Sequence, residues 1–223
     1  RTGDGKIAVL FPYIEGERPA LQTEAELRSF GRTTALLTTA LSRIELAASP
    51  AYPAYYELEQ ASSTYSLDDA VQFCTAPPEA FADLTDPLAA VAAWLTGYRT
   101  KLPELAGLPR QLIHGDLNRT NLLANSRGEL TAVLDFEFVT RDLRAMEPAV
   151  ALSDLIFGSL AEETMWKAVE AYLQGYASAA LLACAEAESL PILIQLRRID
   201  VFLHFLYRYW DGIDNADVVR NQI

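Results

Sequence analysis

The sequence predicts an α+β fold that is mostly helical and that carries a small hairpin with polar residues. Long segments in both halves of the chain have apolar side chains at helical spacing. Between them, two short apolar runs at 111–113 and 130–134 have the length and the flanking turn residues of strands. The chain has 223 residues, of which 51% are hydrophobic, so it is long enough to bury a full core.

Charge and composition exclude several classes of protein. The formal net charge is −12, which argues against a broad contact with the phosphates of a nucleic acid. No apolar run reaches the roughly 18 residues that cross a membrane, and no signal peptide opens the chain. The two cysteines, Cys74 and Cys184, have neither a metal-ligand spacing nor that of a disulfide scaffold, which fits a reducing compartment. We therefore expect a cytoplasmic protein whose partners include neither nucleic acid nor a membrane.

The first elements expected are a strand and a long helix. A Gly-Asp-Gly turn at 3–5 precedes the apolar run 7–11, which is typical of a strand. Thr23 and Glu26 have the spacing of a capping box, which predicts a helix over 23–46. One face of this helix is expected to be buried, and it consists of Leu27, Phe30, Thr34, Leu37, Leu41 and Ile44.

The rest of the chain is expected to be helical outside the hairpin. Prolines interrupt the tyrosine-rich stretch 48–87, where we expect only a short helix ending near Phe73. Glu186 is expected to be a solvated charge near a helix end. The remaining helices are expected over 88–102, 147–157, 161–182 and 189–210.

The polar residues of the hairpin have the pattern that phosphoryl transfer requires. Asp116 and Asn121 lie five residues apart in a loop between two apolar strands, and Asp135 ends the second strand. In this chemistry one carboxylate orients the acceptor hydroxyl and accepts its proton, while a second carboxylate and an amide oxygen hold Mg²⁺ on the phosphates. Taken singly, Asp116 and Asn121 could also be ordinary turn caps, but the three residues together favour the functional interpretation.

The two motifs that contain these residues resemble one known family. HGDLNRTN at 114–121, followed by LDFE at 134–137, resembles the aminoglycoside phosphotransferase family, which shares the protein-kinase fold and includes choline, homoserine type II and methylthioribose kinases. The resemblance implies the helical C-terminal lobe of a kinase-like phosphotransferase that uses ATP and Mg²⁺. It implies that Asp116 is the catalytic base, that His114 braces its loop, and that Asn121, Asp135 and Glu137 hold the metal. Glu137 could equally be a group behind the metal ligands or a solvated acid.

The resemblance extends to both sides of these motifs. KIAVLFPYIEGE is similar to the last N-lobe strand and hinge of the family, which implies that the main chain of Pro12, Tyr13 and Ile14 meets the adenine. Glu147 stands where the family has an acid that anchors the catalytic loop. The late helices resemble those of the homoserine kinase type II subgroup most closely.

One part of the family pattern has no counterpart in this sequence. The glycine-rich phosphate lid and the strand lysine precede the hinge in the family, and nothing here matches them. We therefore expect residues 1–16 to be the last strand and hinge of an otherwise absent N-terminal lobe, and residues 17–223 to be the helical lobe. On this interpretation the chain as given folds without catalysing, and an exposed apolar patch around Leu10, Phe11 and Tyr13 favours self-association, such as a homodimer.

The expected activity is transfer of the γ-phosphoryl group of ATP to a hydroxyl of a small metabolite. An aromatic and acidic segment at 202–217 is either the end of an amphipathic helix or a wall that attracts an ammonium group. Under the second interpretation its substrate residues are Tyr207, Trp210, Asp211 and Asp214. We expect an amine-bearing acceptor and a homoserine kinase type II-like enzyme. The alternatives are an aminoglycoside or choline-type kinase, and a non-catalytic binding module without its phosphate lid.

Overall fold

The computed structural model describes residues 11–47, 50–157 and 161–223. Its helices are α1 (Glu24–Leu41), α2 (Leu67–Thr75), α3 (Thr85–Ala106), α4 (Met146–Ile156), α5 (Glu162–Ala177), α6 (Cys184–Trp210) and α7 (Ala216–Arg220). Its strands are β1 (Arg110–Ile113), β2 (Leu122–Ala124), β3 (Leu130–Val133) and β4 (Thr140–Leu143). The fold is therefore mostly helical with a few short strands, as the sequence predicts.

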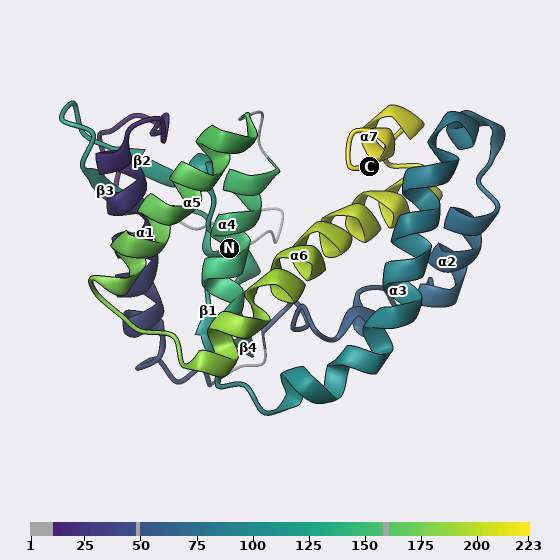
Figure 1. Ribbon diagram of the computed structural model, residues 1–223, viewed down its shortest axis with the longest axis horizontal. Coiled ribbons are helices and arrows are strands. Elements are labelled where there is room, and N and C mark those ends of the chain that lie inside the picture. Colours follow the sequence, from purple (N-terminus) through teal and green to yellow (C-terminus); the bar gives the residue numbers. More distant parts are fainter. Residues whose placement is uncertain (1–10, 48–49, 158–160) are drawn as a thin grey trace, which may run out of the picture.

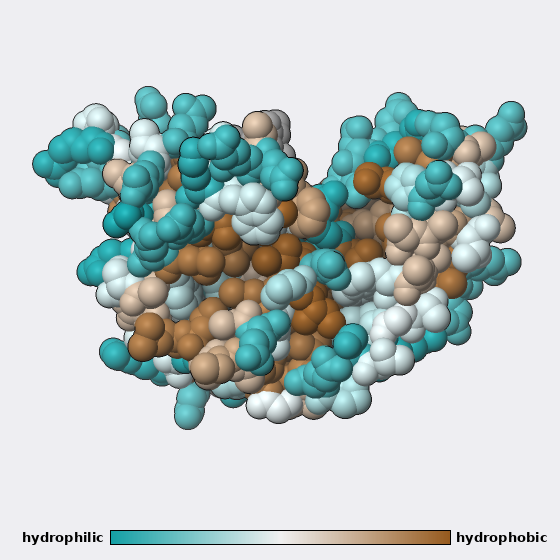
Figure 2. Space-filling view, viewed as in Figure 1, coloured by the Kyte–Doolittle hydropathy of each residue, from teal (hydrophilic) through white to brown (hydrophobic). Residues whose placement is uncertain are grey.

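Helix α6 joins the two halves of the molecule (Figure 1). One half contains α1, α4, α5 and the four strands, and the other contains α2, α3 and α7. Helix α6 packs on α4 in the first half and on α7 in the second. Figure 2 shows a notch between the two halves at the upper edge of this face and apolar side chains across its middle. Residues far apart in the sequence thus meet along α6.

Helices α1 and α5 cross in close contact because both have a glycine at the crossing. A Cβ atom on Gly31 would lie 1.9 Å from the carbonyl oxygen of Tyr172, and one on Gly175 would lie 2.0 Å from that of Arg28. Such distances are far below van der Waals contact, so the backbones can approach this closely only with glycine at both positions.

Helix α1 begins as the sequence predicts and ends earlier. The hydroxyl of Thr23 accepts a hydrogen bond from the backbone N–H of Glu26, and the Glu26 carboxylate accepts one from the backbone N–H of Thr23. Leu27 and Phe30 are buried, but Ile44 lies beyond the end of the helix and is 47% exposed. The expected extension to residue 46 is wrong because the chain leaves the helical conformation after Ser42.

The predicted hairpin is replaced by two separate antiparallel pairs. Strand β1 pairs with β4, and β2 pairs with β3. The sequence analysis identified β1 and β3 and missed β2 and β4, because strands of three or four residues offer too few positions for a clear periodic signal. This pairing places the loop 114–121, between β1 and β2, beside the turn 135–138, between β3 and β4.

Helix α6 differs from its predicted form at its first turn. It begins at Cys184 and not at 189, and Glu186 in this turn is fully buried. The carboxylate of Glu186 accepts a hydrogen bond of 2.8 Å from Nε of Arg144 and one from the backbone N–H of Ala183. The expectation of a solvated charge is therefore wrong, since a distant arginine compensates for its burial.

The N-terminal segment is described from Phe11 onwards, so most of the strand expected over 7–11 and Leu10 lie outside the described residues. Phe11 and Tyr13 are exposed, at 78% and 90%. Glu17 forms an isolated antiparallel bridge to Ala124 at the end of β2. The boundary expected at residue 16 and the homodimer stay predictions. Among the described residues, no helix is long and apolar enough to cross a membrane.

Candidate functional site

Asp116 lies in the loop 114–121, hereafter the HGD loop, and three side chains donate hydrogen bonds to its carboxylate. Oδ1 accepts one from Nη2 of Arg197 at 2.5 Å and one from Nδ2 of Asn118 at 3.2 Å. Oδ2 accepts one from Nδ2 of Asn121 at 2.9 Å. The carboxylate is therefore held in one orientation by hydrogen bonds to both of its oxygens.

The HGD loop turns sharply at Gly115, directly before Asp116. Gly115 has φ +82, and a Cβ atom there would lie 2.7 Å from the carbonyl oxygen of Phe138. Both the left-handed backbone and the close approach require glycine. The loop is thus packed against the turn 135–138, hereafter the acidic turn.

His114 joins the HGD loop to the strand that leads into the acidic turn. Its Nε2 lies 2.8 Å from the carbonyl oxygen of Leu134, and its Nδ1 accepts a hydrogen bond from the backbone N–H of Asp116 at 3.2 Å. This pattern requires the neutral ring with the proton on Nε2. Burial lowers the pKa of His114, although the Leu134 carbonyl and the charge of Asp116 oppose that shift. The arrangement suits a brace, which is the role that the family resemblance implies.

Glu147 lies in the first turn of α4, beneath the HGD loop, and is fully buried. Its carboxylate accepts a hydrogen bond of 2.5 Å from the backbone N–H of His114. Burial raises the pKa of Glu147 to about 7, although backbone N–H groups of His114 and Gly115 act in the opposite direction. The structure thus brings together the two residues that the sequence analysis assigned to loop bracing.

Asn121 and Asp135 lie close to each other because their backbones are linked. The carbonyl oxygen of Asn121 accepts a hydrogen bond of 2.8 Å from the backbone N–H of Leu134, the residue before Asp135. Asp135 has φ 61, a left-handed conformation that is rare for residues with a side chain and that often marks a functional site. Asp135 and Glu137 are both exposed on the acidic turn.

These residues fit a hard divalent cation. The hydrogen bonds of Asn121 to Asp116 use its amide nitrogen, so its amide oxygen remains for a metal. In the described part of the chain, no group of three or more acidic, histidine or cysteine side chains is placed to hold an ion by itself. Mg²⁺ commonly takes one or two protein carboxylates and completes its shell with phosphate oxygens and water. Glu137 as a third ligand stays a prediction.

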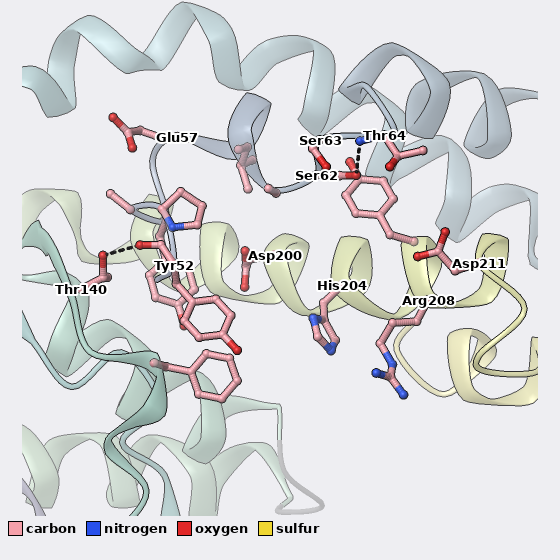
Figure 3. A pocket seen from close by; sticks show the side chains of 17 residues that line it. Tyr52, Glu57, Ser62, Ser63, Thr64, Thr140, Asp200, His204, Arg208 and Asp211 are labelled. Carbon is pink, nitrogen blue, oxygen red and sulfur yellow. Dashed lines mark hydrogen bonds between the residues drawn. The ribbon is translucent and has the colours of Figure 1, made fainter. Parts of the chain in front are cut away.

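A cavity of about 370 Å³ lies between α6 and the segment 52–64, hereafter the α6 cavity (Figure 3). Asp200, His204, Arg208 and Asp211 line it from α6 and its C-terminal end, and Glu57 lines it from the opposite side. Its aromatic walls are Tyr52, Tyr55, Phe138 and Tyr207. Tyr55, which lines the cavity, reaches the HGD loop directly, because its hydroxyl donates to the carbonyl oxygen of Gly115. Arg197 adds a second connection, since it bonds both Asp116 and Tyr55.

The four predicted substrate residues do not form one wall. Tyr207 and Asp211 line the α6 cavity, and Asp211 accepts a hydrogen bond of 2.8 Å from the hydroxyl of Tyr65. Trp210 does not line the cavity and packs behind it, edge-on against the ring of Tyr65 and against Tyr207. Asp214 pairs with Arg208, with its carboxylate 2.6 Å from Nε. A helix turns its residues in different directions, so a cluster in sequence does not make a cluster on one face.

The predicted hinge residues Pro12, Tyr13 and Ile14 are exposed and lie in an irregular segment before the Glu17 bridge. Contact of this segment with a nucleotide stays a prediction.

The family of the chain follows from comparison with known proteins. The family model described as "Phosphotransferase enzyme family" (APH) matches residues 1–182. The chain belongs to this family. The matched range includes both motifs of the site, the HGD loop and the acidic turn.

Curated relatives of this phosphotransferase-family chain include two homoserine kinases. The homoserine kinase of Gluconobacter oxydans is 34% identical over 119 residues, which are 53% of this chain and 37% of that protein. The homoserine kinase of Acidiphilium cryptum is 34% identical over 113 residues, which are 51% of this chain and 35% of that protein. The chain therefore matches only about a third of the length of these relatives.

Solved structures show the same fold. An amicoumacin kinase in complex with AMP-PNP and Ca²⁺ has a TM-score of 0.59 at 15% identity, covering 84% of this chain and 53% of that one. A choline/ethanolamine kinase family protein from Mesorhizobium loti has a TM-score of 0.58 at 16% identity, covering 94% of this chain and 64% of that one. The mostly helical fold of this phosphotransferase-family chain is thus the C-terminal lobe of kinase-like phosphotransferases, as expected.

The sequence analysis missed several residues that the structure places at the site. Arg197 and Asp200 lie three residues apart on α6 and were not singled out. Tyr55 and Glu57 come from the tyrosine-rich stretch that was expected to be irregular. The available signal was weak: three charged residues, Arg197, Arg198 and Asp200, lie among apolar residues of a helix.

Buried Asp142, on β4, predicts a pH dependence of stability for this phosphotransferase-family chain. Its carboxylate accepts hydrogen bonds of 2.6 Å from the backbone N–H groups of Tyr55 and Leu143. Burial raises its pKa from 3.8 to about 7, even though these bonds oppose the shift. Between these two values the folded protein holds a proton that the unfolded chain has lost, so the free energy of unfolding falls as pH rises.

From pH 4 to pH 7 we expect the free energy of unfolding of wild type to fall further than that of Asp142→Asn. The difference between the two falls is on the order of a few kcal/mol. The asparagine can accept only one of the two bonds, which adds an offset that does not vary with pH. Urea unfolding at pH 4, 5, 6 and 7 measures the difference. Equal pH slopes for the two proteins would show that Asp142 does not titrate in this range.

Proposed function

We propose that the whole protein is an ATP-dependent phosphotransferase that transfers the γ-phosphoryl group to a hydroxyl of a small, amine-bearing metabolite, in the manner of a homoserine kinase. The observation that carries the proposal is the geometry of the HGD loop. Asp116 is fixed by Arg197 and Asn121, and the loop lies against the acidic turn that carries Asp135. Phosphoryl transfer depends almost entirely on this kind of positioning.

Each side chain has a defined task in this mechanism. Asp116 orients the acceptor hydroxyl and accepts its proton, while His114 and Glu147 hold the HGD loop in place. Asn121 and Asp135, with Glu137 as a further candidate, hold Mg²⁺, which neutralises charge on the phosphates of ATP. A related kinase of the same fold was solved with AMP-PNP and Ca²⁺, which supports a nucleotide and a divalent cation here. Pro12, Tyr13 and Ile14 are the proposed contacts of the adenine.

The α6 cavity is the proposed acceptor site, and its size favours a small acceptor. At about 370 Å³ it lies near the lower end of the range of roughly 300–1,000 Å³ that is usual for ligand pockets. Glu57, Asp200 and Asp211 contribute carboxylates to its lining, and aromatic rings lie beside them. Carboxylates and aromatic faces together attract an ammonium group.

A second candidate for the acceptor is an amino alcohol of the choline or ethanolamine type. It is favoured because the basic side chains that line the α6 cavity, Arg208 and His204, offer little free positive charge. Arg208 is already paired with Asp214 at 2.6 Å. Burial lowers the pKa of His204, and Arg208 and Arg197 lower it further, which favours the neutral ring. An amino-acid acceptor carries a carboxylate, which would have to compete with Asp214 for Arg208, the arginine among the described lining residues. An amino alcohol needs no such partner.

A phosphorylation assay on the whole protein tests the proposal. Purified protein with Mg-ATP is offered homoserine, choline, ethanolamine, glucosamine, an aminoglycoside and the neutral compounds glucose and glycerol separately, and ADP release and the mass of the product are recorded. We expect an acceptor-dependent increase of 80 Da on one of the small amine-bearing compounds. Transfer to neutral hydroxyl compounds alone would overturn the proposal of an amine-bearing acceptor. Nucleotide binding without transfer to any acceptor would favour a non-catalytic binding module.

A further inference from the structure

Arg197, on α6, connects two parts of the site that lie far apart in the sequence. Its Nη2 donates to Oδ1 of Asp116 at 2.5 Å, and its Nη1 donates to the hydroxyl of Tyr55 at 2.6 Å. The hydroxyl of Tyr55 donates in turn to the carbonyl oxygen of Gly115, the residue before Asp116. Arg197 and Tyr55 thus hold two consecutive residues of the HGD loop in one closed set of hydrogen bonds.

The surroundings of Arg197 fix the direction of its guanidinium group. The side chain is only 18% exposed, its guanidinium carbon lies 5.5 Å from the centre of the Tyr55 ring, and Asp200 lies 3.8 Å from Nη1. A planar guanidinium with partners on two edges has little freedom to rotate. The segment that carries Tyr55 is itself anchored, because its backbone N–H donates to Asp142 at 2.6 Å.

The hydrogen bonds of the carboxylate distinguish its two oxygens. Each oxygen of an ionised carboxylate has about two lone-pair sites. On Oδ1 of Asp116 both are occupied, by Arg197 and Asn118, whereas on Oδ2 only Asn121 donates. Oδ2 is therefore the oxygen with a site left for the proton of an acceptor hydroxyl.

We propose that Arg197 is a positioning residue for phosphoryl transfer: with Tyr55 it holds Oδ1 of Asp116, so that Oδ2 faces the acceptor hydroxyl. This inference rests on the proposed function and adds a residue from α6 to the machinery of the HGD loop. Arg197 touches neither the acceptor nor the metal in this arrangement. It acts through Asp116, and it links the wall of the α6 cavity to the reacting carboxylate.

The test compares Arg197→Ala with wild type and with Arg220→Ala in the whole protein. Arg220 is a matched control, since it also pairs with an aspartate at 2.6 Å, Asp83, but lies at the C-terminal end, remote from the HGD loop. We expect Arg197→Ala to lower kcat by on the order of 10²-fold, with the KM for acceptor and the Kd for Mg-ATP changed by less than about threefold. Arg220→Ala keeps wild-type kcat.

Rescue separates positioning from general damage to the fold. Guanidinium ion added to Arg197→Ala should restore part of kcat in a saturable way, and methylammonium should restore less because it cannot form two hydrogen bonds in a plane. Arg197→Lys should lie between wild type and Arg197→Ala. An unchanged kcat in Arg197→Ala would overturn the proposal, as would a loss that appears only in the KM for the acceptor.

A measurement that does not need activity keeps this proposal separate from the proposed function. Hydrogen exchange of peptides covering 114–121 should be faster in Arg197→Ala than in wild type and Arg220→Ala, with unchanged exchange in α3. If wild type transfers phosphate to no acceptor, the proposed function fails. The exchange data still test whether Arg197 holds the HGD loop in place. If wild type is active and neither kcat nor exchange responds to Arg197→Ala, only the positioning role fails.

Discussion

The Asp116→Ala variant of the whole protein is expected to lose phosphoryl transfer while it still binds nucleotide. The loss should be at least about 10²–10⁴-fold in kcat, which is the usual contribution of a positioned general base. Loss of the hydroxyl's orientation adds to it, because the carboxylate also places the acceptor for attack. Coupled detection of ADP measures turnover, and calorimetry with Mg-ATP measures nucleotide binding.

Two controls make this result specific. Asp83→Ala removes an aspartate of the same charge that pairs with Arg220 far from the HGD loop, and it should keep wild-type turnover. Asp116→Asn keeps the shape of the side chain and its acceptor oxygen, and it should be nearly as inactive because a neutral amide does not accept the hydroxyl proton. Turnover within tenfold of wild type in Asp116→Ala would contradict the assignment of Asp116 as the base.

The second large effect is expected from Asp135→Asn, on the concentration of Mg²⁺ that activity requires. A neutral amide is a weaker ligand for a hard cation than a carboxylate, so half-maximal activity should need at least about tenfold more Mg²⁺. The fold should tolerate this change well, since Asp135 has φ 61 and asparagine adopts the left-handed conformation as readily as aspartate. The KM for acceptor should change much less.

Titration of activity with Mg²⁺ at saturating ATP gives the requirement of each variant. Glu137→Gln, a change of the same kind two residues along the acidic turn, reports whether the second acid is also a ligand. Superimposable titrations of wild type and Asp135→Asn would show that Asp135 does not hold the metal.

Local features were predictable because their determinants are close together in the sequence. The capping box of Thr23 and Glu26 starts α1 as expected, since both of its hydrogen bonds form within four residues. The positions of Asp116, Asn121 and Asp135 relative to short apolar runs led to the prediction of one site. The structure bonds Asn121 to the Asp116 carboxylate and to the backbone of Leu134, the residue before Asp135. His114 and Glu147 were assigned from the family resemblance, and the structure brings their backbone and carboxylate into contact.

The tertiary structure alone decided which distant groups complete the site. Helix α6 crosses from one half of the molecule to the other, and so it carries Arg197 to Asp116 across 81 positions of sequence. The burial of Glu186 against Arg144 and the pairing of β1 with β4 are of the same kind. Local pattern determines which residues form a helix and which face is apolar. The partners of its charged residues depend on how the helices pack against one another, and the local sequence pattern does not determine this packing.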